Sequence, residues 1–384
     1  METLFKKIRN DHFDKLRSVI LNNERYHLES DTWTHTCLVF SKAKDDFNKI
    51  VSLLHDLGKP LAKEHIDGKD YYRGHEGIST FEALKYIDDI ERILGKDKIL
   101  DVLYTINYHG MLWQKSDRQI KHYFVNDIDK YNKIYDFSLY DQAGNIFFDD
   151  EKNRKNKERL LEEDFNKKSN RISNNVKTKE YKNKCYFMIG LPLSGKSTYI
   201  KNNMKNLQVL SRDDILMEYV KEKFTCNSCN GKGYIEGWVG DNIDHSICPT
   251  CKGECHPNYS DGWKLLSDED QKEIDKRLRE KFNELRNLDE DFVIDMTNLS
   301  WKARRRWLTQ LKKHTPIAKT FLVDFETLLK RNERRYDEEG KIIPESVLYN
   351  MAKRLELPLS SEFNEIEIIT NNTKIQHKNK GELK

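Results

Sequence analysis

The architecture of this chain is best predicted from one short segment, Gly190-Leu191-Pro192-Leu193-Ser194-Gly195-Lys196-Ser197-Thr198. It satisfies every position of the GxxxxGK[ST] pattern and follows an apolar run, residues 185–189, that predicts a buried strand. In such a loop, glycines let backbone N–H groups surround phosphate oxygens, a lysine contacts the outer phosphates and a Ser hydroxyl holds Mg²⁺. The sequence therefore predicts a nucleoside triphosphate site; a Gly-rich turn without a ligand is the alternative. The predicted binding residues are Gly190, Ser194, Gly195, Lys196, Ser197 and Thr198.

Length and composition restrict the class of protein. The 384 residues suffice for two or three domains with their own cores, and 37 % hydrophobic content is low but globular. The net charge of +3 results from 67 basic and 64 acidic residues, so total charge hardly argues for a nucleic-acid partner. We find no secretory segment and no apolar stretch long enough to span a bilayer. We therefore expect a soluble cytoplasmic protein without membrane contact, whose cysteines stay thiols or bind metal.

The chain divides into segments of different pattern. Residues 1–150 show helical periodicity without convincing strands, and residues 151–184 form a basic polar tract typical of a helix tail and linker. Beyond the tract, apolar runs alternate with helical segments, which predicts a parallel α/β sheet. The predicted strands are residues 185–189, 209–210, 292–295, 320–325 and 366–370. Ser300 is expected to cap the helix that begins at Trp301, and residues 224–257 are expected to be an insertion.

Residues downstream of the loop indicate phosphate transfer. Asp213 is expected at the end of a strand, on the side where an open α/β sheet gathers its ligands. A carboxylate there orients and deprotonates an acceptor hydroxyl for attack on a γ-phosphate; the alternative role is a helix cap. Arg331 and Arg335 share one helix face and are candidates to clamp the transferring phosphate. A solvated basic helix is the alternative there.

Together these motifs resemble the 5′-hydroxyl polynucleotide kinase domain of the phage end-healing kinase-phosphatase. The resemblance covers about residues 185–358 apart from the insertion, and rests on residues 190–198, Arg212-Asp213-Asp214, residues 297–299 with Arg304-Arg305, residues 328–332, 343–344 and 357–358. It implies that Asp213 is the general base and that Lys196 and Ser197 serve ATP and Mg²⁺. Arg331 and Arg335 would be lid arginines on the phosphates. That family's arginine for the acceptor 3′-phosphate is Leu216 here, so acceptor positioning is expected to differ.

A second constellation occupies the first part of the chain, in the order His35, His55-Asp56, His75, His109 and Asp141. Imidazole and carboxylate donors suit a hydrolytic Zn, Mn, Fe, Co or Ni site, although a single histidine is more often an ordinary core or surface residue. The order resembles the HD phosphohydrolase superfamily. The resemblance implies one metal held by His35, His55, Asp56 and Asp141, and a second held by His75 and His109 and bridged by Asp56.

The same resemblance bears on phosphate binding. Two metals would polarise the phosphoryl group and generate the attacking hydroxide, and Lys59 would neutralise the scissile phosphate. Many relatives carry an arginine four residues after the final aspartate, where this chain has Asn145. Phosphate binding is therefore expected to depend more on Lys59, or on Lys115 and Arg118.

The insertion carries two C-x-x-C pairs, Cys226/Cys229 and Cys248/Cys251, each followed by glycine. Four thiolates so spaced are typical of a tetrahedral structural Zn²⁺ site. The pairs resemble the knuckles of the cysteine-rich region of DnaJ-type chaperones, but one pair of knuckles argues against a chaperone. The insertion is either a metal-stapled mini-domain or a nucleic-acid contact. Further donors would be Cys255 and His256, and the nucleic-acid contacts would be Lys232, Tyr234, Trp238 and Lys252.

The combination resembles the bacterial HD-fused polynucleotide kinases. The expected domains are an all-α HD domain at residues 1–165, a basic linker at 166–183, an α/β kinase domain at 184–384 and a zinc ribbon at 224–257. The resemblance implies ATP-dependent phosphorylation of RNA or DNA 5′-hydroxyl ends, and removal of 3′-phosphate or 2′,3′-cyclic phosphate with Mn²⁺, Ni²⁺, Co²⁺ or Zn²⁺, upstream of a ligase. The alternatives are an HD nucleotidase fused to a small-molecule kinase, and an active kinase whose HD half only binds nucleic acid.

Overall fold

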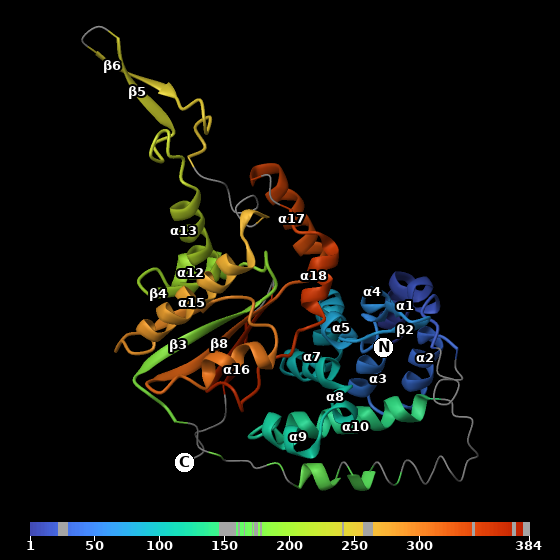
Figure 1. The fold of residues 1–384 in the computed structure, drawn as a ribbon. Helices are drawn as coiled ribbons and strands as arrows, with labels where there is room; N and C mark the ends of the chain where they lie inside the picture. The colour runs from blue at the N-terminus through green and yellow to red at the C-terminus, as the bar shows by residue number, and fades with distance from the viewer. Residues whose placement is uncertain are drawn as a thin grey trace.

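The structure, a computed structural model, consists of a helical half followed by an α/β half (Figure 1). It describes residues 1–21, 30–145, 159, 162–164, 166–170, 172, 176, 179–239, 242–255, 264–339, 342–370 and 374–378. We call residues 1–145 the helical half and residues 181–378 the α/β half. No helix among these described residues combines the length and apolar character that crossing a membrane requires.

The helical half consists mainly of helices, as the sequence predicts. Its elements are α1 (Glu2–Arg17), α2 (Thr32–Lys42), α3 (Asp46–Leu54), α4 (Lys59–Ala62), β1 (Glu64–Ile66), β2 (Lys69–Tyr71), α5 (His75–Ala83), η1 (Leu84–Tyr86), α6 (Ile87–Leu94), η2 (Lys96–Lys98), α7 (Ile99–Tyr108), α8 (Met111–Gln114), α9 (Asp117–Tyr123) and α10 (Ile128–Gly144). Helices α2, α3, α7 and α10 pack together around buried side chains such as Val39, Ile50 and Phe137. Asp31 and Asp45 cap α2 and α3, which fixes where these helices begin.

The expectation of an all-α first part is wrong at one place, the antiparallel hairpin β1–β2. Asp67 and Gly68 connect its strands, both with positive φ, at 50° and 76°. A two-residue Asp-Gly connection of this kind is the favoured hairpin turn, because its twist matches the strands. The turn signal was therefore present in the sequence, although the strands are too short to show alternation.

The α/β half is built on a mostly parallel sheet, also as predicted. Its elements are β3 (Asn183–Gly190), α12 (Lys196–Asn203), β4 (Gln208–Ser211), α13 (Arg212–Phe224), β5 (Tyr234–Val239), β6 (Asn242–Ile247), α15 (Asp268–Leu285), β7 (Phe292–Asp295), α16 (Trp301–Leu308), β8 (His314–Leu322), α17 (Phe325–Glu339), α18 (Glu345–Ala352), β9 (Glu365–Thr370) and β10 (Lys374–Lys378). Within the described residues the strand order is β10-β9-β8-β3-β7-β4, and only β10 runs antiparallel to its neighbour. The phosphate-binding loop follows the central strand β3, so it opens at the carboxyl edge of the sheet.

Three local predictions in this half need correction. The strand expected at residues 320–325 begins at His314 and ends at Leu322, because Asp324 accepts hydrogen bonds from Thr327 and caps α17. Helix α17 therefore starts earlier than the basic run near Arg331 suggested. Strand β4 ends at Ser211, and Asp213 lies in the first turn of α13 rather than in the strand. The cap predicted at Ser300 is confirmed by its hydrogen bond from Ala303 N–H.

The insertion leaves the α/β half beyond α13 and forms an antiparallel hairpin, β5–β6, that projects away from the sheet (Figure 1). The described part of the predicted linker contacts both halves. The Lys168 ammonium reaches the Leu112 carbonyl oxygen at 3.3 Å, and the Asn364 amide donates to the Lys179 carbonyl oxygen at 3.5 Å.

The halves also meet through the segment that follows α18. Tyr104 and Tyr108 of α7 donate hydrogen bonds from their hydroxyls to the Pro358 and Leu357 carbonyls. The Asn107 amide bonds Leu355 and Leu357 at 3.0 and 2.8 Å. Gly77 lies so close that an added Cβ would stand 2.2 Å from the Ala352 carbonyl oxygen. Residues 352–358 of the α/β half are therefore held by the helix that ends beside His109.

Candidate functional sites

The phosphate-binding loop is shaped by residues with unusual backbone angles. Gly190 and Gly195 have φ of 152° and 96°, and an added Cβ at Gly190 would lie 2.7 Å from the Phe321 carbonyl oxygen. The Lys196 ammonium folds back onto the Gly190 and Leu191 carbonyl oxygens at 3.0 and 2.7 Å. The Ser194 hydroxyl is buried without a hydrogen-bond partner among the described residues. This cradle of polar groups at the start of α12 suits phosphate oxygens.

Two aspartates lie near the loop, Asp295 at the end of β7 and Asp213 in the first turn of α13. The Ser197 hydroxyl donates to Asp295 Oδ2 at 3.1 Å, the pairing expected of a Mg²⁺ site in a phosphate-binding-loop enzyme. Burial lowers the pKa of Lys196 to about 8, although Asp295 and Asp213 oppose that shift. Burial raises the pKa of Asp295, and Asp213 and Asp214 add to that rise. Asp213 therefore lies near enough to Lys196 and Asp295 to influence the pKa of each.

Asp295 was not among the residues predicted from the sequence. It ends the apolar strand Phe292–Asp295, which the sequence predicts with these bounds. The rule that placed Asp213 at the carboxyl edge of the sheet applies equally to Asp295. The signal was thus an aspartate directly after three buried apolar residues.

The predicted lid arginines lie on α17. The Arg331 guanidinium donates to the Leu193 carbonyl of the loop at 2.9 Å, and Arg335 lies one turn further along the helix. Leu216, which stands at the position of the acceptor-binding arginine of the kinase family, is fully buried against α15 with Val220 and Ile274. It is a core residue and is not accessible to an acceptor. Arg331 thus contacts the loop, as expected of a lid residue.

Arg304, one of the residues on which the kinase resemblance rests, lies in the protein interior. It is fully buried and makes a bidentate ion pair with Glu362 at 2.8 and 2.7 Å. A third guanidinium nitrogen donates to the carbonyls of Asn298, Leu299 and Glu356. Removing one partner of such a pair typically costs about 3–5 kcal/mol. Arg304 therefore stabilises the fold and does not face a ligand.

The helical half brings all six predicted metal ligands together. In the first group, His35 Nε2 lies 2.9 Å from Asp141 Oδ1, and His55 Nε2 lies 3.2 Å from Asp56 Oδ2 and 3.5 Å from Asp141 Oδ1. Lys59 Nζ contacts Asp56 Oδ2 at 2.6 Å. These ligands come from α2, α10 and the end of α3, whose packing therefore assembles the group.

A second group shares the same aspartate. His75 Nε2 lies 3.1 Å from Asp56 Oδ1 and 3.1 Å from His109 Nε2. The two oxygens of Asp56 thus face different histidines, as the resemblance implied for a bridging ligand. Within each set, His35/His55/Asp56 and Asp56/His75/His109, the donor atoms lie within 4.8 Å of one another. The arrangement can hold two metal ions.

Backbone hydrogen bonds orient three of the rings. Nδ1 of His55, His75 and His109 bonds the carbonyl three residues earlier, at 2.9, 2.9 and 2.7 Å. Each bond leaves Nε2 as the nitrogen that points into the group, which is how metal-binding histidines are usually held. The buried polar atoms of the group agree with this orientation. His55 Nε2 and both Asp56 oxygens are buried without a well-aligned hydrogen bond among the described residues. The donor set therefore fits divalent transition metals.

The charges of this cluster depend on one another. Burial alone would lower the pKa of His55, but Asp56 and Asp141 raise it to about 10. Burial lowers the pKa of His109 to about 4, and His75 and His55 lower it further. Although burial opposes it, His55 and Lys59 hold the pKa of Asp56 well below its usual range. Protons on His55 and Lys59 thus balance the carboxylates, and a metal ion would replace the proton on His55.

The four predicted zinc ligands also converge. Sγ of Cys226 lies 3.9 Å from Sγ of Cys248, and Sγ of Cys229 lies 3.6 Å from Sγ of Cys251. A tetrahedral zinc site with Zn–S near 2.3 Å requires about 3.8 Å between sulfurs. Backbone N–H groups of Cys251 and Thr250 lower the pKa of Cys248 to about 6, which favours the thiolate. This Cys₄ cluster can hold Zn²⁺.

The structure describes some of the other residues predicted in the insertion, and others lie outside the described part of the chain. Lys232 forms an ion pair with Glu236 at 3.0 Å, and Tyr234 packs edge-on against His245. Cys255 points to the Gly253 carbonyl and is not in the Cys₄ cluster. The Trp238 side chain and His256 lie outside the described residues. Lys252 has a φ of 51° in the turn after Cys251.

A comparison with protein-family models agrees with the geometry of the α/β half. Residues 186–358 match a family described as an AAA domain. This region is a kinase-like domain with a phosphate-binding loop and a parallel sheet. No curated protein shows a significant match to the chain.

Proposed function

We propose that this protein is a bifunctional end-healing enzyme, an ATP-dependent 5′-hydroxyl polynucleotide kinase joined to a metal-dependent 2′,3′-phosphoesterase of the HD type. RNA or DNA ends with a 5′-hydroxyl and a 3′-phosphate or 2′,3′-cyclic phosphate are the proposed substrates, and a ligase would use the products. The observation that carries the proposal is the pair of preassembled sites. One is the loop with Lys196, Asp213 and Asp295, and the other is the cluster centred on Asp56.

In the kinase reaction, Asp213 would take the proton of the acceptor hydroxyl. It is exposed in the first turn of α13, so an acceptor can reach it from solvent. Lys196 and the backbone at the start of α12 would bind the phosphates of ATP, and Mg²⁺ held by Ser197 and Asp295 would neutralise charge on them. Arg331, already at the loop, would stabilise the charge that develops on the transferred group.

In the phosphoesterase reaction, Asp56 contacts both histidine groups, and Lys59 would neutralise the bound phosphate. Asp56 raises the pKa of Lys59 against the effect of burial, so the ammonium stays charged. Bound metals would polarise the phosphoryl oxygens and supply a hydroxide nucleophile. The Nδ1 hydrogen bonds of His55, His75 and His109 keep the rings oriented between turnovers.

One incubation tests both activities. A short RNA with a 5′-hydroxyl and a 2′,3′-cyclic phosphate is mixed with the protein, ATP, Mg²⁺ and Mn²⁺ or Ni²⁺, and both termini are analysed by mass spectrometry. We expect a 5′-phosphate and a ring-opened or phosphate-free 3′ end. Lys196→Ala should lose only the first change, and Asp56→Ala only the second.

The competing function uses the same sites on small molecules. An HD nucleotidase fused to a small-molecule kinase would act on nucleosides and mononucleotides and leave both ends of the oligonucleotide unchanged. Parallel reactions with a nucleoside and a nucleoside 3′-phosphate therefore decide between the two proposals. Efficient turnover of these compounds without turnover of the oligonucleotide would contradict the end-healing function.

A further inference from the structure

A group of basic side chains lies where the two halves meet. Lys115 follows α8, Arg118 and His122 belong to α9, and Arg305 belongs to α16 of the α/β half. Arg118, His122 and Arg305 are exposed. Among the described residues, none of Lys115, Arg118 and Arg305 forms an ion pair, so their charge is not compensated. We call these four residues, together with Tyr123 and Trp301, the junction patch.

The junction patch is held in one arrangement by contacts across the two halves. The rings of Tyr123 and Trp301 stack with centroids 4.9 Å apart, and the Arg305 guanidinium lies 4.5 Å from the Trp301 centroid. Arg305 also donates to His122 Nε2 at 2.9 Å. Burial lowers the pKa of His122, and Arg305 and Arg118 lower it further, so the ring accepts this bond in its neutral form. The Arg305 guanidinium is therefore oriented before any ligand arrives.

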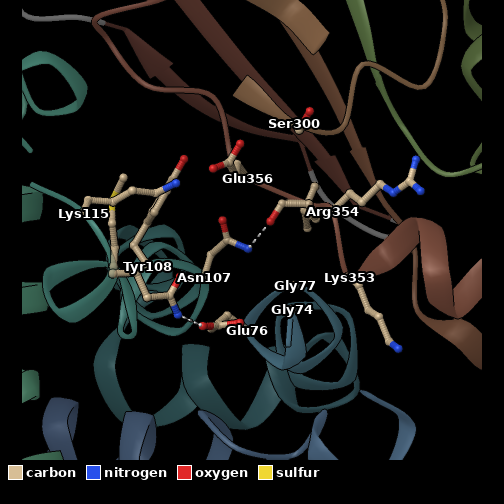
Figure 2. A pocket seen from close by; sticks show the side chains of 13 residues that line it. Gly74, Glu76, Gly77, Asn107, Tyr108, Lys115, Ser300, Lys353, Arg354 and Glu356 are labelled. Carbon is tan, nitrogen blue, oxygen red and sulfur yellow. Dashed lines mark hydrogen bonds between the residues drawn. The ribbon is translucent and has the colours of Figure 1, made fainter. Parts of the chain in front are cut away.

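A pocket of about 320 Å³ opens beside the junction patch (Figure 2). Lys115 and Ser300 line it at the patch, and Glu76, whose carboxylate lies 3.5 Å from Nδ1 of His75 in the candidate metal centre, lines it as well. Glu356 also lines it, but its carboxylate is engaged by Trp301 N–H at 2.6 Å and by the Tyr123 hydroxyl. The volume is near the lower end of the ~300–1,000 Å³ range of small-ligand sites, so a nucleotide-sized group fits but a duplex does not.

We propose that the junction patch and this pocket bind the sugar-phosphate backbone of a single-stranded polynucleotide whose 3′ end is directed to the candidate metal centre. The inference deepens the proposed function and rests on it. Uncompensated, exposed cations are what a phosphate backbone requires. Trp301 and Tyr123 serve as the support that holds Arg305, because their own faces are covered. The cations come from both halves, so the patch exists only while the halves are docked.

The test measures binding rather than turnover. A fluorescent single-stranded RNA of about 20 nucleotides with a 3′-phosphate is titrated without ATP or divalent metal between about 50 and 200 mM salt. Each phosphate contact to a single strand contributes about 0.7 to the slope of log Kobs against log[salt]. The Arg118→Ala/Arg305→Ala variant should therefore lose about 1.4 from that slope, and about tenfold in affinity at the lower salt.

Two matched variants separate charge from structure. Arg118→Lys/Arg305→Lys keeps both charges and should keep the slope. Lys6→Ala/Lys96→Ala removes two exposed lysines of the helical half outside the patch and should also keep it. Equal melting temperatures of the double-alanine variant and the wild type verify that the halves remain docked. If the double-alanine variant melts lower, the single variant Arg118→Ala, which leaves the Arg305 contacts intact, is expected to lose about 0.7 from the slope.

The outcomes distinguish this inference from the proposed function. If the wild type binds RNA with a steep slope and the double-alanine variant has the same slope, the junction patch is not the binding surface, and the end-healing function is unaffected. If the wild type does not bind RNA yet turns over a nucleoside 3′-phosphate, the polynucleotide substrate is wrong, and the inference fails with it. Displacement of the RNA by polyglutamate as effectively as by unlabelled RNA would assign the patch to an acidic protein instead.

Discussion

The two candidate sites of this molecule are assembled in different ways. The phosphate-binding loop is nine consecutive residues that span the end of β3 and the start of α12, and its ligand groups are mostly backbone and adjacent side chains. The metal cluster collects His35, Asp56, His75, His109 and Asp141 from helices separated along most of the helical half. A local site survives changes elsewhere as long as its strand and helix remain. A dispersed site depends on the packing of every helix that contributes to it.

The sites also differ in how they balance charge. At the loop, Lys196 lies near two carboxylates, and its own pKa is lowered by burial. In the cluster, the buried carboxylates are balanced by protonated side chains. The pKa of His55 is raised, whereas the pKa of His109 is lowered. The loop thus offers an ammonium and backbone N–H groups to an anionic ligand, whereas the buried cluster offers carboxylates and imidazoles to cations. Changes in one site should leave the other working, and the following predictions test that separation.

The largest effect is expected at the kinase base. Asp213→Ala should slow phosphate transfer to a terminal hydroxyl about 10²–10⁴-fold, because a general base contributes that much to rate. The side chain is exposed, so folding should be unaffected. Steady-state kinetics with an oligonucleotide that carries a free 5′-hydroxyl measure the loss. Phosphoesterase activity is the internal control and should be unchanged; wild-type-like phosphate transfer would remove Asp213 from its role.

The next largest effect is expected in the metal cluster and should likewise be confined to that site. Asp56→Ala removes the carboxylate that faces both histidine groups. Substituting a residue that only hydrogen-bonds a metal ligand already lowers metal affinity about 10–100-fold, so loss of this shared ligand should exceed that range. Metal content after dialysis, measured by plasma mass spectrometry, gives the result, and kinase activity should persist. His65→Ala, which removes an exposed histidine of the β1–β2 hairpin, is the matched control and should keep its metal.

The same contrast explains what could be predicted from the sequence. The loop, the strand Phe292–Asp295 and the Ser300 cap follow from local patterns, because backbone chemistry at these places depends on neighbouring residues. The six ligands of the cluster could be named only from their order and a family resemblance. The number of residues between two ligands does not indicate how the helices that carry them pack. Asp295 was missed although its position is local. The burial of Arg304 depends on Glu362, 58 residues away, and no local pattern indicates that contact.

A smaller effect is expected from pH at the loop. The phosphates of ATP favour protonated Lys196, whose pKa in the free protein lies at about 8. Below that pH the ammonium is already present, and above it binding must take up a proton. The Kd for ATP should therefore be flat below pH 8 and rise by up to about tenfold per unit above it. Asp213→Asn, which removes a carboxylate that raises the pKa of Lys196, should move the break to lower pH. A Kd that stays constant well above that pH would contradict the assignment of Lys196.

The smallest effect is expected from the zinc hairpin, the third region, which stands apart from both sites in Figure 1. Two of the residues predicted to contact nucleic acid already have partners, since Lys232 pairs with Glu236 and Tyr234 packs on His245. Replacing residues 225–257 by a short Gly-Ser linker should therefore change the KM for ATP and for a long acceptor by less than about twofold, or about 0.4 kcal/mol. The salt slope of RNA binding should stay that of the wild type, in contrast to the junction-patch variant. A shallower slope with an unchanged KM for ATP would show instead that the hairpin contacts the strand, and would make the Cys₄ cluster the staple of a nucleic-acid-binding element.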